Sequence, residues 1–233
     1  MTNNIVIRTE KLSRIYEQGI IAVHALQDVD FICKRGELIA LAGASGSGKS
    51  TLLNLIGTLD HATSGKIIID NKEVTSMRRA QAARFRLGHV GFVFQAYNLI
   101  PVFSAFENAE YTLFLQGVPA SQRRDIVMPL LERVGLNGMT DRRPSELSGG
   151  QQQRVAVVRA IASKPDFVLA DEPTANLDSE SSNSLLRLFE ELNQQEGITF
   201  ILASHDTQVI ERAKRIVRLR DGRIISDELK VAA

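Results

Sequence analysis

The sequence predicts an α/β fold built on a largely parallel sheet. Short apolar runs recur along the chain, at residues 38–42, 91–94, 167–170 and 199–203. Their length and composition are typical of strands that are buried on both faces. Segments with helical patterns separate them, as expected where crossover helices join parallel strands. Ligands bind at the carboxyl ends of such strands, so we expect the functional residues to follow these runs.

A glycine-rich loop follows the first apolar run. Residues 43–51 match Gly-x-x-x-x-Gly-Lys-Ser, the pattern of a phosphate-binding loop. Its glycines let backbone N–H groups surround phosphate oxygens. Lys49 supplies a charge for the outer phosphates, and the Ser50 hydroxyl suits Mg²⁺. A helix at 50–58 would point its positive N-terminal end at the anion. The predicted contacts are Gly43, Ala44, Ser45, Gly46, Ser47, Gly48, Lys49, Ser50 and Thr51.

The length, net charge and cysteine content of the chain limit the classes of function that we expect. The 233 residues suit one domain, and the net charge of +1 gives no electrostatic reason to expect nucleic acid. The single cysteine, Cys33, excludes an intrachain disulfide and is typical of a reducing cytosol. We expect no signal peptide, and no apolar run approaches the roughly 18 residues that span a bilayer. Any work at a membrane would need a partner that provides the membrane part.

Four predicted segments flank the loop before residue 90. Residues 5–9 and 22–31 are predicted as strands, and Tyr16 lies between them. Tyr16 has two open roles: its ring stacks on an adenine, a contact worth about 1 kcal/mol, or it packs on the core. A further strand is predicted at 66–69 and a short helix at 76–86.

The residue pattern changes after residue 95, and the segment that follows is predicted to be an inserted helical subdomain. Residues 104–107, Ser-Ala-Phe-Glu, form a capping-box pattern that predicts a helix start. Apolar residues over 126–134 have helical spacing. Aromatic residues crowd residues 97–106, and two interpretations stay open: a local core, or a groove that receives a partner helix.

Polar residues stand at the ends of the later strands, where we expect catalysis. Asp171 is placed to hold Mg²⁺, and Glu172 to deprotonate a water that attacks the γ-phosphate. Four apolar residues before them and Pro173 after them argue against an ordinary acidic loop. Gln95 could reach a metal-bound water and His205 the γ-phosphate or the water, although either residue alone would be read as an ordinary loop residue.

A second anion-binding pattern lies at residues 147–151, Leu-Ser-Gly-Gly-Gln, before a helix that ends near 163. Another helix is predicted at 179–196, after the segment Asn-Leu-Asp at 176–178. A closing hairpin pairs 215–220 with 223–225, and residues 230–233 are expected to fray.

Over residues 5–227 these motifs resemble the nucleotide-binding subunits of ABC (ATP-binding cassette) systems. The resemblance implies a P-loop NTPase (RecA-like) core with a mainly parallel sheet, an N-terminal antiparallel β-subdomain and an inserted α-helical subdomain. Within one domain, 1–233, the core would occupy 1–95 and 155–233 and the helical subdomain 96–154. ATP and Mg²⁺ are the implied cofactors, with Ser50, Gln95 and Asp171 at the metal and Glu172, His205 and Gln95 in catalysis. The further implied ATP contacts are Tyr16, Ser148, Gly149, Gly150, Gln151 and Asp178.

The resemblance also implies partners. Two copies would form a head-to-tail homodimer, with each ATP between the phosphate loop of one subunit and residues 147–151 of the other. A separate integral membrane permease would dock near residues 95–106. The protein would then be cytoplasmic and peripheral on the cytoplasmic face of the inner membrane.

Three stretches, 57–67, 89–108 and 141–161, resemble the branch that contains lipoprotein-release, macrolide-export and cell-division ATPases. That branch implies export or transmembrane mechanical work. The run Gly-Gln-Gln-Gln-Arg at 150–154 departs slightly from the family pattern and leaves the catalytic set intact. The alternatives are the ATPase of an amino-acid-type importer, and a soluble ABC protein that acts on ribosomes or DNA. A third is a binding module without turnover, against which Glu172 and His205 argue.

Overall fold

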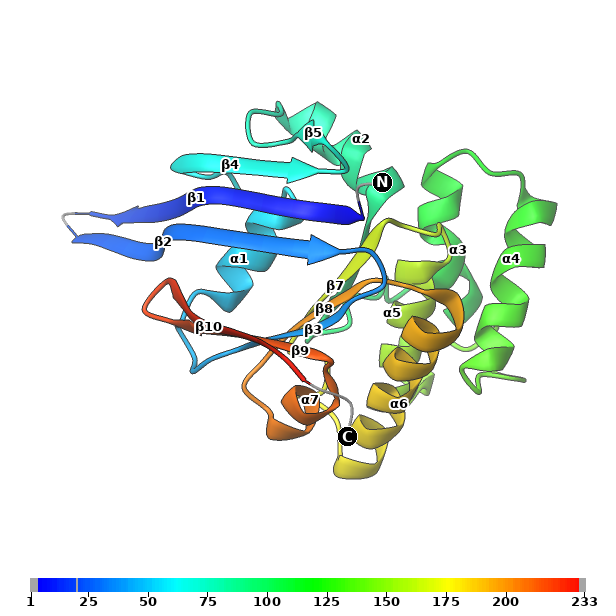
Figure 1. The fold of residues 1–233 in the computed structure, drawn as a ribbon. Coiled ribbons are helices and arrows are strands. Elements are labelled where there is room, and N and C mark those ends of the chain that lie inside the picture. The colour runs from blue at the N-terminus through cyan, green and yellow to red at the C-terminus, as the bar shows by residue number, and fades with distance from the viewer. Residues whose placement is uncertain (1–3, 20, 231–233) are drawn as a thin grey trace.

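The computed structural model describes residues 4–19 and 21–230, and its centre is a six-stranded sheet (Figure 1). The strand order is β10-β9-β3-β8-β7-β6. All neighbours run parallel except β9 and β10, which form an antiparallel hairpin. The predicted α/β class with a mainly parallel sheet is therefore confirmed. The strands are β3 (Leu38–Ala42), β6 (Val90–Phe94), β7 (Phe167–Asp171), β8 (Phe200–Ser204), β9 (Arg215–Arg220) and β10 (Arg223–Leu229).

The central strands are apolar throughout because successive side chains enter two different cores. In β7, Phe167 and Leu169 pack towards the second sheet, and Val168 and Ala170 pack towards the helices on the opposite face. Helix α1 (Lys49–Ile56) contributes its leucines to the first of these cores, between the two sheets. The phosphate loop therefore lies between a fully buried strand and a helix with one buried face.

The second sheet is antiparallel, in the order β2-β1-β4-β5. Two of its strands are longer than the sequence predicts, because bulges shift the pairing register and interrupt the alternation of apolar residues. As a result Tyr16 lies inside a strand, opposite Val23, rather than between strands. The strands are β1 (Ile5–Gln18), β2 (Ile21–Lys34), β4 (Ser64–Ile69) and β5 (Lys72–Glu73).

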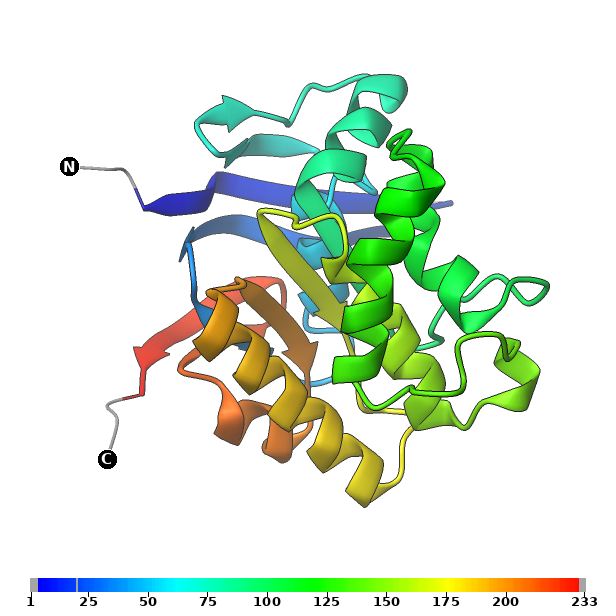
Figure 2. The same cartoon turned by 90° about the vertical axis from the view of Figure 1, so that its right-hand side faces the viewer.

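Helices α3 and α4 form a layer beside the core, on the right of Figure 1 and towards the viewer in Figure 2. Ser104 caps α3 with the predicted capping box. The predicted boundary between the helical subdomain and the core falls between residues 154 and 155, but helix α5 is continuous there. This helix packs against both layers. The helices are α2 (Arg79–His89), α3 (Ala105–Leu115), α4 (Ala120–Arg133), α5 (Gly149–Ile161), α6 (Ser179–Glu196) and α7 (Thr207–Arg212), with a 3₁₀ turn at Pro144–Glu146.

Further differences from the predicted elements lie outside β1 and β2. Helix α2 starts three residues after the predicted position, and the short elements β5 and α7 are not predicted. Lys230 is held by hydrogen bonds from its ammonium to Ile210 and Glu211, so fraying does not begin there. The rest of the expected frayed tail, 231–233, lies outside the described residues. In the described ranges, none of the helices is both long and apolar enough to cross a bilayer.

Candidate functional site

The carboxyl ends of β3, β6, β7 and β8 meet at one open cavity of about 530 Å³. This volume suits a nucleotide-sized ligand, since ligand pockets span roughly 300–1,000 Å³. Both the phosphate loop and the predicted catalytic residues face it, as expected at this edge of a parallel sheet. The lining residues are Tyr16, Val23, His24, Ala25, Ser45, Gly46, Gly48, Lys49, Ser50, Thr51, Gln95, Glu172, Ala175 and His205.

The phosphate loop requires glycine at its two ends. Gly48 has φ 104°, a left-handed conformation that L side chains rarely adopt, and α1 begins at the next residue. At Gly43 an added Cβ would lie 2.4 Å from the Leu219 carbonyl oxygen and 2.5 Å from Ser47 Oγ. The loop is therefore packed too closely for side chains at these positions. Because α1 has no acidic residue in its first turn, nothing there competes with an anion at its N-terminus.

Lys49 is buried, and its charge is balanced by oxygen atoms. Its Nζ donates to the carbonyl oxygens of Gly43 at 2.8 Å and Ala44 at 3.0 Å, and lies 3.9 Å from Glu172 Oε1. These acceptors are weaker partners for an ammonium than a polyphosphate would be. A cradle that a Cβ would fill, a helix N-terminus and a buried cation together fit the phosphates of a nucleotide.

Ser50 and Asp171 bring two oxygen ligands together. Ser50 Oγ donates to Asp171 Oδ1 at 3.0 Å, across the gap between α1 and β7. Burial raises the pKa of the Asp171 carboxyl, and the charge of Glu172 adds to the rise, whereas the Ser50 hydrogen bond and Lys49 oppose it. A hard cation beside these oxygens would offset the burial of the carboxylate, so the pair fits Mg²⁺.

Glu172 is held on both of its carboxylate oxygens. Ser204 Oγ donates to Oε2 at 2.9 Å, and His205 Nδ1 lies 2.9 Å from Oε1. The Glu172 backbone has φ 45°, and its N–H donates to the Ala203 carbonyl. Positive φ is uncommon outside glycine and marks residues that the surrounding structure constrains. Sequence reasoning missed Ser204 because a serine at the end of an apolar strand carries no distinctive pattern.

Gln95 enters the same cavity and is joined to the segment that follows Glu172. Its Nε2 donates to Asn176 Oδ1 at 3.4 Å, and Asn176 Nδ2 donates to the Gln95 carbonyl at 3.0 Å. The hydroxyl of Tyr97 donates to the Asn176 carbonyl at 3.3 Å. Hydrogen bonds thus connect the turn after β6 directly to the turn after β7.

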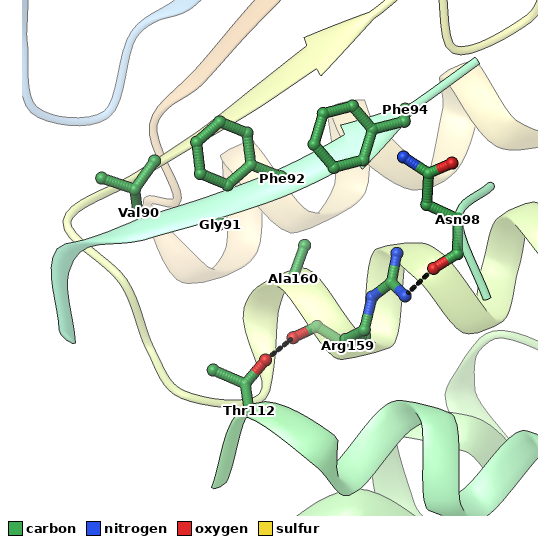
Figure 3. A pocket seen from close by; sticks show the side chains of 8 residues that line it. All are labelled: Val90, Gly91, Phe92, Phe94, Asn98, Thr112, Arg159 and Ala160. Carbon is green, nitrogen blue, oxygen red and sulfur yellow. Dashed lines mark hydrogen bonds between the residues drawn. The ribbon is translucent and has the colours of Figure 1, made fainter. Parts of the chain in front are cut away.

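Arg159 of α5 supports the turn after β6 from behind (Figure 3). Its guanidinium donates to the carbonyl oxygens of Tyr97 and Asn98, whose backbones have φ 60° and 49°. Burial lowers the pKa of Arg159. A small cavity of about 200 Å³ is lined by Arg159 together with Phe92, Phe94 and Asn98 (Figure 3). The arginine therefore satisfies two carbonyl groups in an unusual backbone conformation.

Tyr16 is half-buried and lines the cavity, which favours the stacking role over packing on the core. Its hydroxyl donates to Asp60 Oδ2 at 2.7 Å, and the guanidinium of Arg14 lies 4.3 Å from the centre of its ring. An aromatic ring beside a phosphate cradle is suited to stacking on a nucleobase.

The Leu-Ser-Gly-Gly-Gln segment faces a different cavity, of about 260 Å³, which Ser148, Gly150 and Gln151 line. Ser148 caps α5, and Gly149 lies against the Tyr97 hydroxyl. Asp178 is not among the residues that line the nucleotide-sized cavity. It caps α6 and accepts hydrogen bonds from Ser181, which lines the second cavity; these bonds lower the pKa of Asp178.

Comparison with known proteins defines the class to which this fold and site belong. The ABC transporter family model matches residues 26–175. The chain is 41% identical to the lipoprotein-releasing system ATP-binding protein LolD of Pseudoalteromonas translucida, over 97% of each chain. It is 44% identical to the macrolide export ATP-binding/permease protein MacB of Rhodopseudomonas palustris, over 96% of this chain and 34% of that protein.

A solved dimeric ATP-binding cassette in a post-hydrolysis state, bound to ADP and phosphate, superposes with a TM-score of 0.89. It is 36% identical and the match covers 97% of this chain and all of that one. The chain belongs to the ABC transporter family. It is an ATP-binding subunit with ATPase activity, so the predicted family, fold and reaction are confirmed.

Proposed function

We propose that this ATPase drives a separate membrane subunit that performs export or transmembrane mechanical work. The observation that carries the proposal is the division of the ATP-binding machinery over two surfaces. The phosphate loop, Gln95, Glu172 and His205 share one cavity, whereas Ser148 and Gly150 line another. In a single chain, the two predicted anion-binding segments therefore face separate cavities.

A head-to-tail homodimer would join the two halves. The Leu-Ser-Gly-Gly-Gln segment of each subunit would then cover the ATP held by its partner, with N–H groups at the start of α5 directed at the γ-phosphate. Asp178 would lie beside this contact through Ser181. The dimeric state of the solved cassette supports this arrangement.

The hydrolysis that we assign to this site depends on position and charge more than on covalent chemistry. Lys49 and the loop N–H groups would hold the phosphates, and Glu172 would accept a proton from the attacking water. His205 would orient the carboxylate and the γ-phosphate. Mg²⁺ held by Ser50, Asp171 and Gln95 would neutralise charge that develops on the phosphate oxygens. Hydrolysis removes the γ-phosphate that joins the two subunits, so the dimer would open.

Exposed apolar residues in the helical layer support the docking of a membrane subunit. Val102, Phe114 and Leu115 are 70%, 55% and 52% exposed. The rings of Phe103, Tyr111 and Phe114 lie in contact along this face of α3. Large exposed apolar residues that gather in one place mark interaction sites. This docking would hold the protein at the cytoplasmic face of the inner membrane.

The names of the relatives favour export over import. LolD and MacB belong to lipoprotein-releasing and macrolide-export systems by name, and this chain spans nearly all of the former and the ATP-binding third of the latter. We therefore assign the substrate class to lipoproteins, peptides or drugs that leave the cytoplasmic membrane.

The test is a pull-down of tagged Glu172→Gln protein, with ATP, from detergent-solubilised native membranes. A captured subunit with few spanning helices and a large extracytoplasmic domain would support export or mechanical work. A permease with many helices and a solute-binding protein would favour an importer, and the absence of any membrane protein would contradict the transport role. Val102→Glu in the same background should abolish capture, whereas the equally exposed Leu229→Glu on β10 should not.

A further inference from the structure

The ring of Tyr16 is fixed by two side chains that the family motifs do not include. Its hydroxyl donates to Asp60 Oδ2 at 2.7 Å, and Arg14 Nη2 donates to Asp60 Oδ1 at 2.9 Å. The same guanidinium lies over the ring, 4.3 Å from its centre. These three residues form a closed triangle, which we name the Tyr16 clamp. Because Arg14 covers one face of the ring, a base could stack only on the other.

The carboxylate of the clamp is ionised at neutral pH. Burial raises the pKa of Asp60, but hydrogen bonds from Tyr16 and the His61 N–H and the charge of Arg14 outweigh burial and leave the pKa lowered. Hydrogen bonds to a charged acceptor are stronger than those between neutral groups. The clamp therefore holds the ring in one orientation, where a free tyrosine would exchange between rotamers.

The clamp is attached to the helix that carries the phosphate site. Leu59 and Asp60 donate their backbone N–H groups to the Asn54 carbonyl of α1 at 2.8 and 3.3 Å. On the other side, Thr63 Oγ1 accepts from the Ile15 N–H at 3.0 Å. Asp60 thus connects the end of α1, whose first residue is Lys49, to the strand that carries Tyr16.

From this geometry we propose that Asp60 and Arg14 are positioning residues for nucleobase recognition. They hold the Tyr16 ring at a set distance from the phosphate loop, so that the base of a nucleotide can stack on the ring while its phosphates bind the loop. The proposal rests on the proposed role of Tyr16 in ATP binding and extends it to two residues that touch the ring and not the nucleotide. Ordering the ring in advance lowers the entropy cost of binding.

The test compares two ligands that differ in the base. ATP and inorganic tripolyphosphate, both with Mg²⁺, are titrated into wild-type protein and into Tyr16→Ala, Tyr16→Phe, Asp60→Ala and the Tyr16→Phe/Asp60→Ala double variant. Tyr16→Ala should raise the Kd for ATP about 5- to 100-fold, the usual effect of losing a stacked aromatic ring. Asp60→Ala should raise it about 3- to 10-fold. The Kd for tripolyphosphate should stay within about twofold throughout, because the phosphate loop is unchanged.

The double variant tests whether Asp60 acts through the ring. If it does, Asp60→Ala adds little once the Tyr16 hydroxyl is gone, since residues in one hydrogen-bond network are not additive. Glu190→Ala is the control, because it removes the ion pair between Glu190 and Arg212. The side chains of Arg212 and Glu190 are 26% and 28% exposed, close to the 22% and 24% of Arg14 and Asp60. Its Kd values should match those of the wild type.

Three results would overturn the inference. The first is an unchanged Kd for ATP in Asp60→Ala when Tyr16→Ala binds ATP weakly. The second is an equal loss of ATP and tripolyphosphate binding in Asp60→Ala, and the third is full additivity of the two substitutions in the double variant. Normal ATP binding by Tyr16→Ala would instead contradict the base-stacking role itself. The two failures are therefore distinguishable.

Discussion

His205 Nδ1 lies 2.9 Å from Glu172 Oε1, and this pair spans two adjacent parallel strands. Glu172 follows the last residue of β7 and His205 the last residue of β8, so the strand register brings them together. Ser204 holds the second carboxylate oxygen from the same strand end. The carboxylate that we assign as general base is therefore oriented before a substrate arrives.

The first prediction concerns this carboxylate. Glu172→Gln should lower kcat for ATP hydrolysis by roughly 10²- to 10⁴-fold, the usual contribution of a general base. The amide keeps the shape of the side chain, so ATP should still bind and dimers should accumulate. Steady-state hydrolysis and size-exclusion chromatography with ATP measure both effects. Glu191→Gln, at an exposed position of α6, is the control; near-normal turnover in Glu172→Gln would refute the assignment.

The second prediction concerns the phosphate cradle. Lys49→Ala should abolish ATP binding in a direct titration, because the buried cation that faces the outer phosphates is lost. The carbonyl oxygens of Gly43 and Ala44 would then lose the ammonium that they face, and although Ala44 still accepts from the Ser47 N–H, both oxygens would repel an anion. Lys164→Ala, outside the cavity, should bind as the wild type does. An unchanged Kd in Lys49→Ala would count against the phosphate role.

A third prediction tests Ser204, which the sequence did not single out. Ser204→Ala should lower kcat roughly 10- to 150-fold, in line with about 1.5–3 kcal/mol for a hydrogen bond to a charged group. The KM for ATP should change little, since the hydroxyl contacts Glu172 and not the phosphate loop. In the Glu172→Gln background the same substitution should have a smaller effect. Equal effects in both backgrounds would show that Ser204 acts independently of Glu172.

The fourth prediction concerns Arg159. Arg159→Gln should reduce the free energy of unfolding by about 1.5–3 kcal/mol, because two carbonyl groups lose a charged donor. Hydrogen exchange of the amides at Tyr97 and Asn98 should accelerate, since the guanidinium holds both residues at positive φ. Urea denaturation and exchange mass spectrometry provide the measurements. Arg187→Gln, at an exposed position of α6, should change neither; a stable Arg159→Gln with unchanged exchange would exclude the supporting role.

Motifs that depend on local backbone chemistry were predictable from sequence. The phosphate loop requires glycine at Gly48 because of that residue's own φ of 104°, and the capping box at Ser104 starts α3 as predicted. The central strands were predictable because burial on both faces leaves continuous apolar runs. β1 and β2 were underestimated, since bulges interrupt their alternation in a way that only their pairing reveals.

The sequence by itself determined the family, the parallel core and the group of side chains at the ends of its strands, because loop chemistry and burial leave marks in short segments. Only the tertiary structure decided which side chains hold these groups in place. Asp60 reaches Tyr16 across 44 positions, Ser204 reaches Glu172 across 32, and Arg159 reaches Tyr97 across 62. Contacts between residues far apart in the sequence depend on how the packed layers bring strand ends and helices together. No short sequence pattern encodes such contacts.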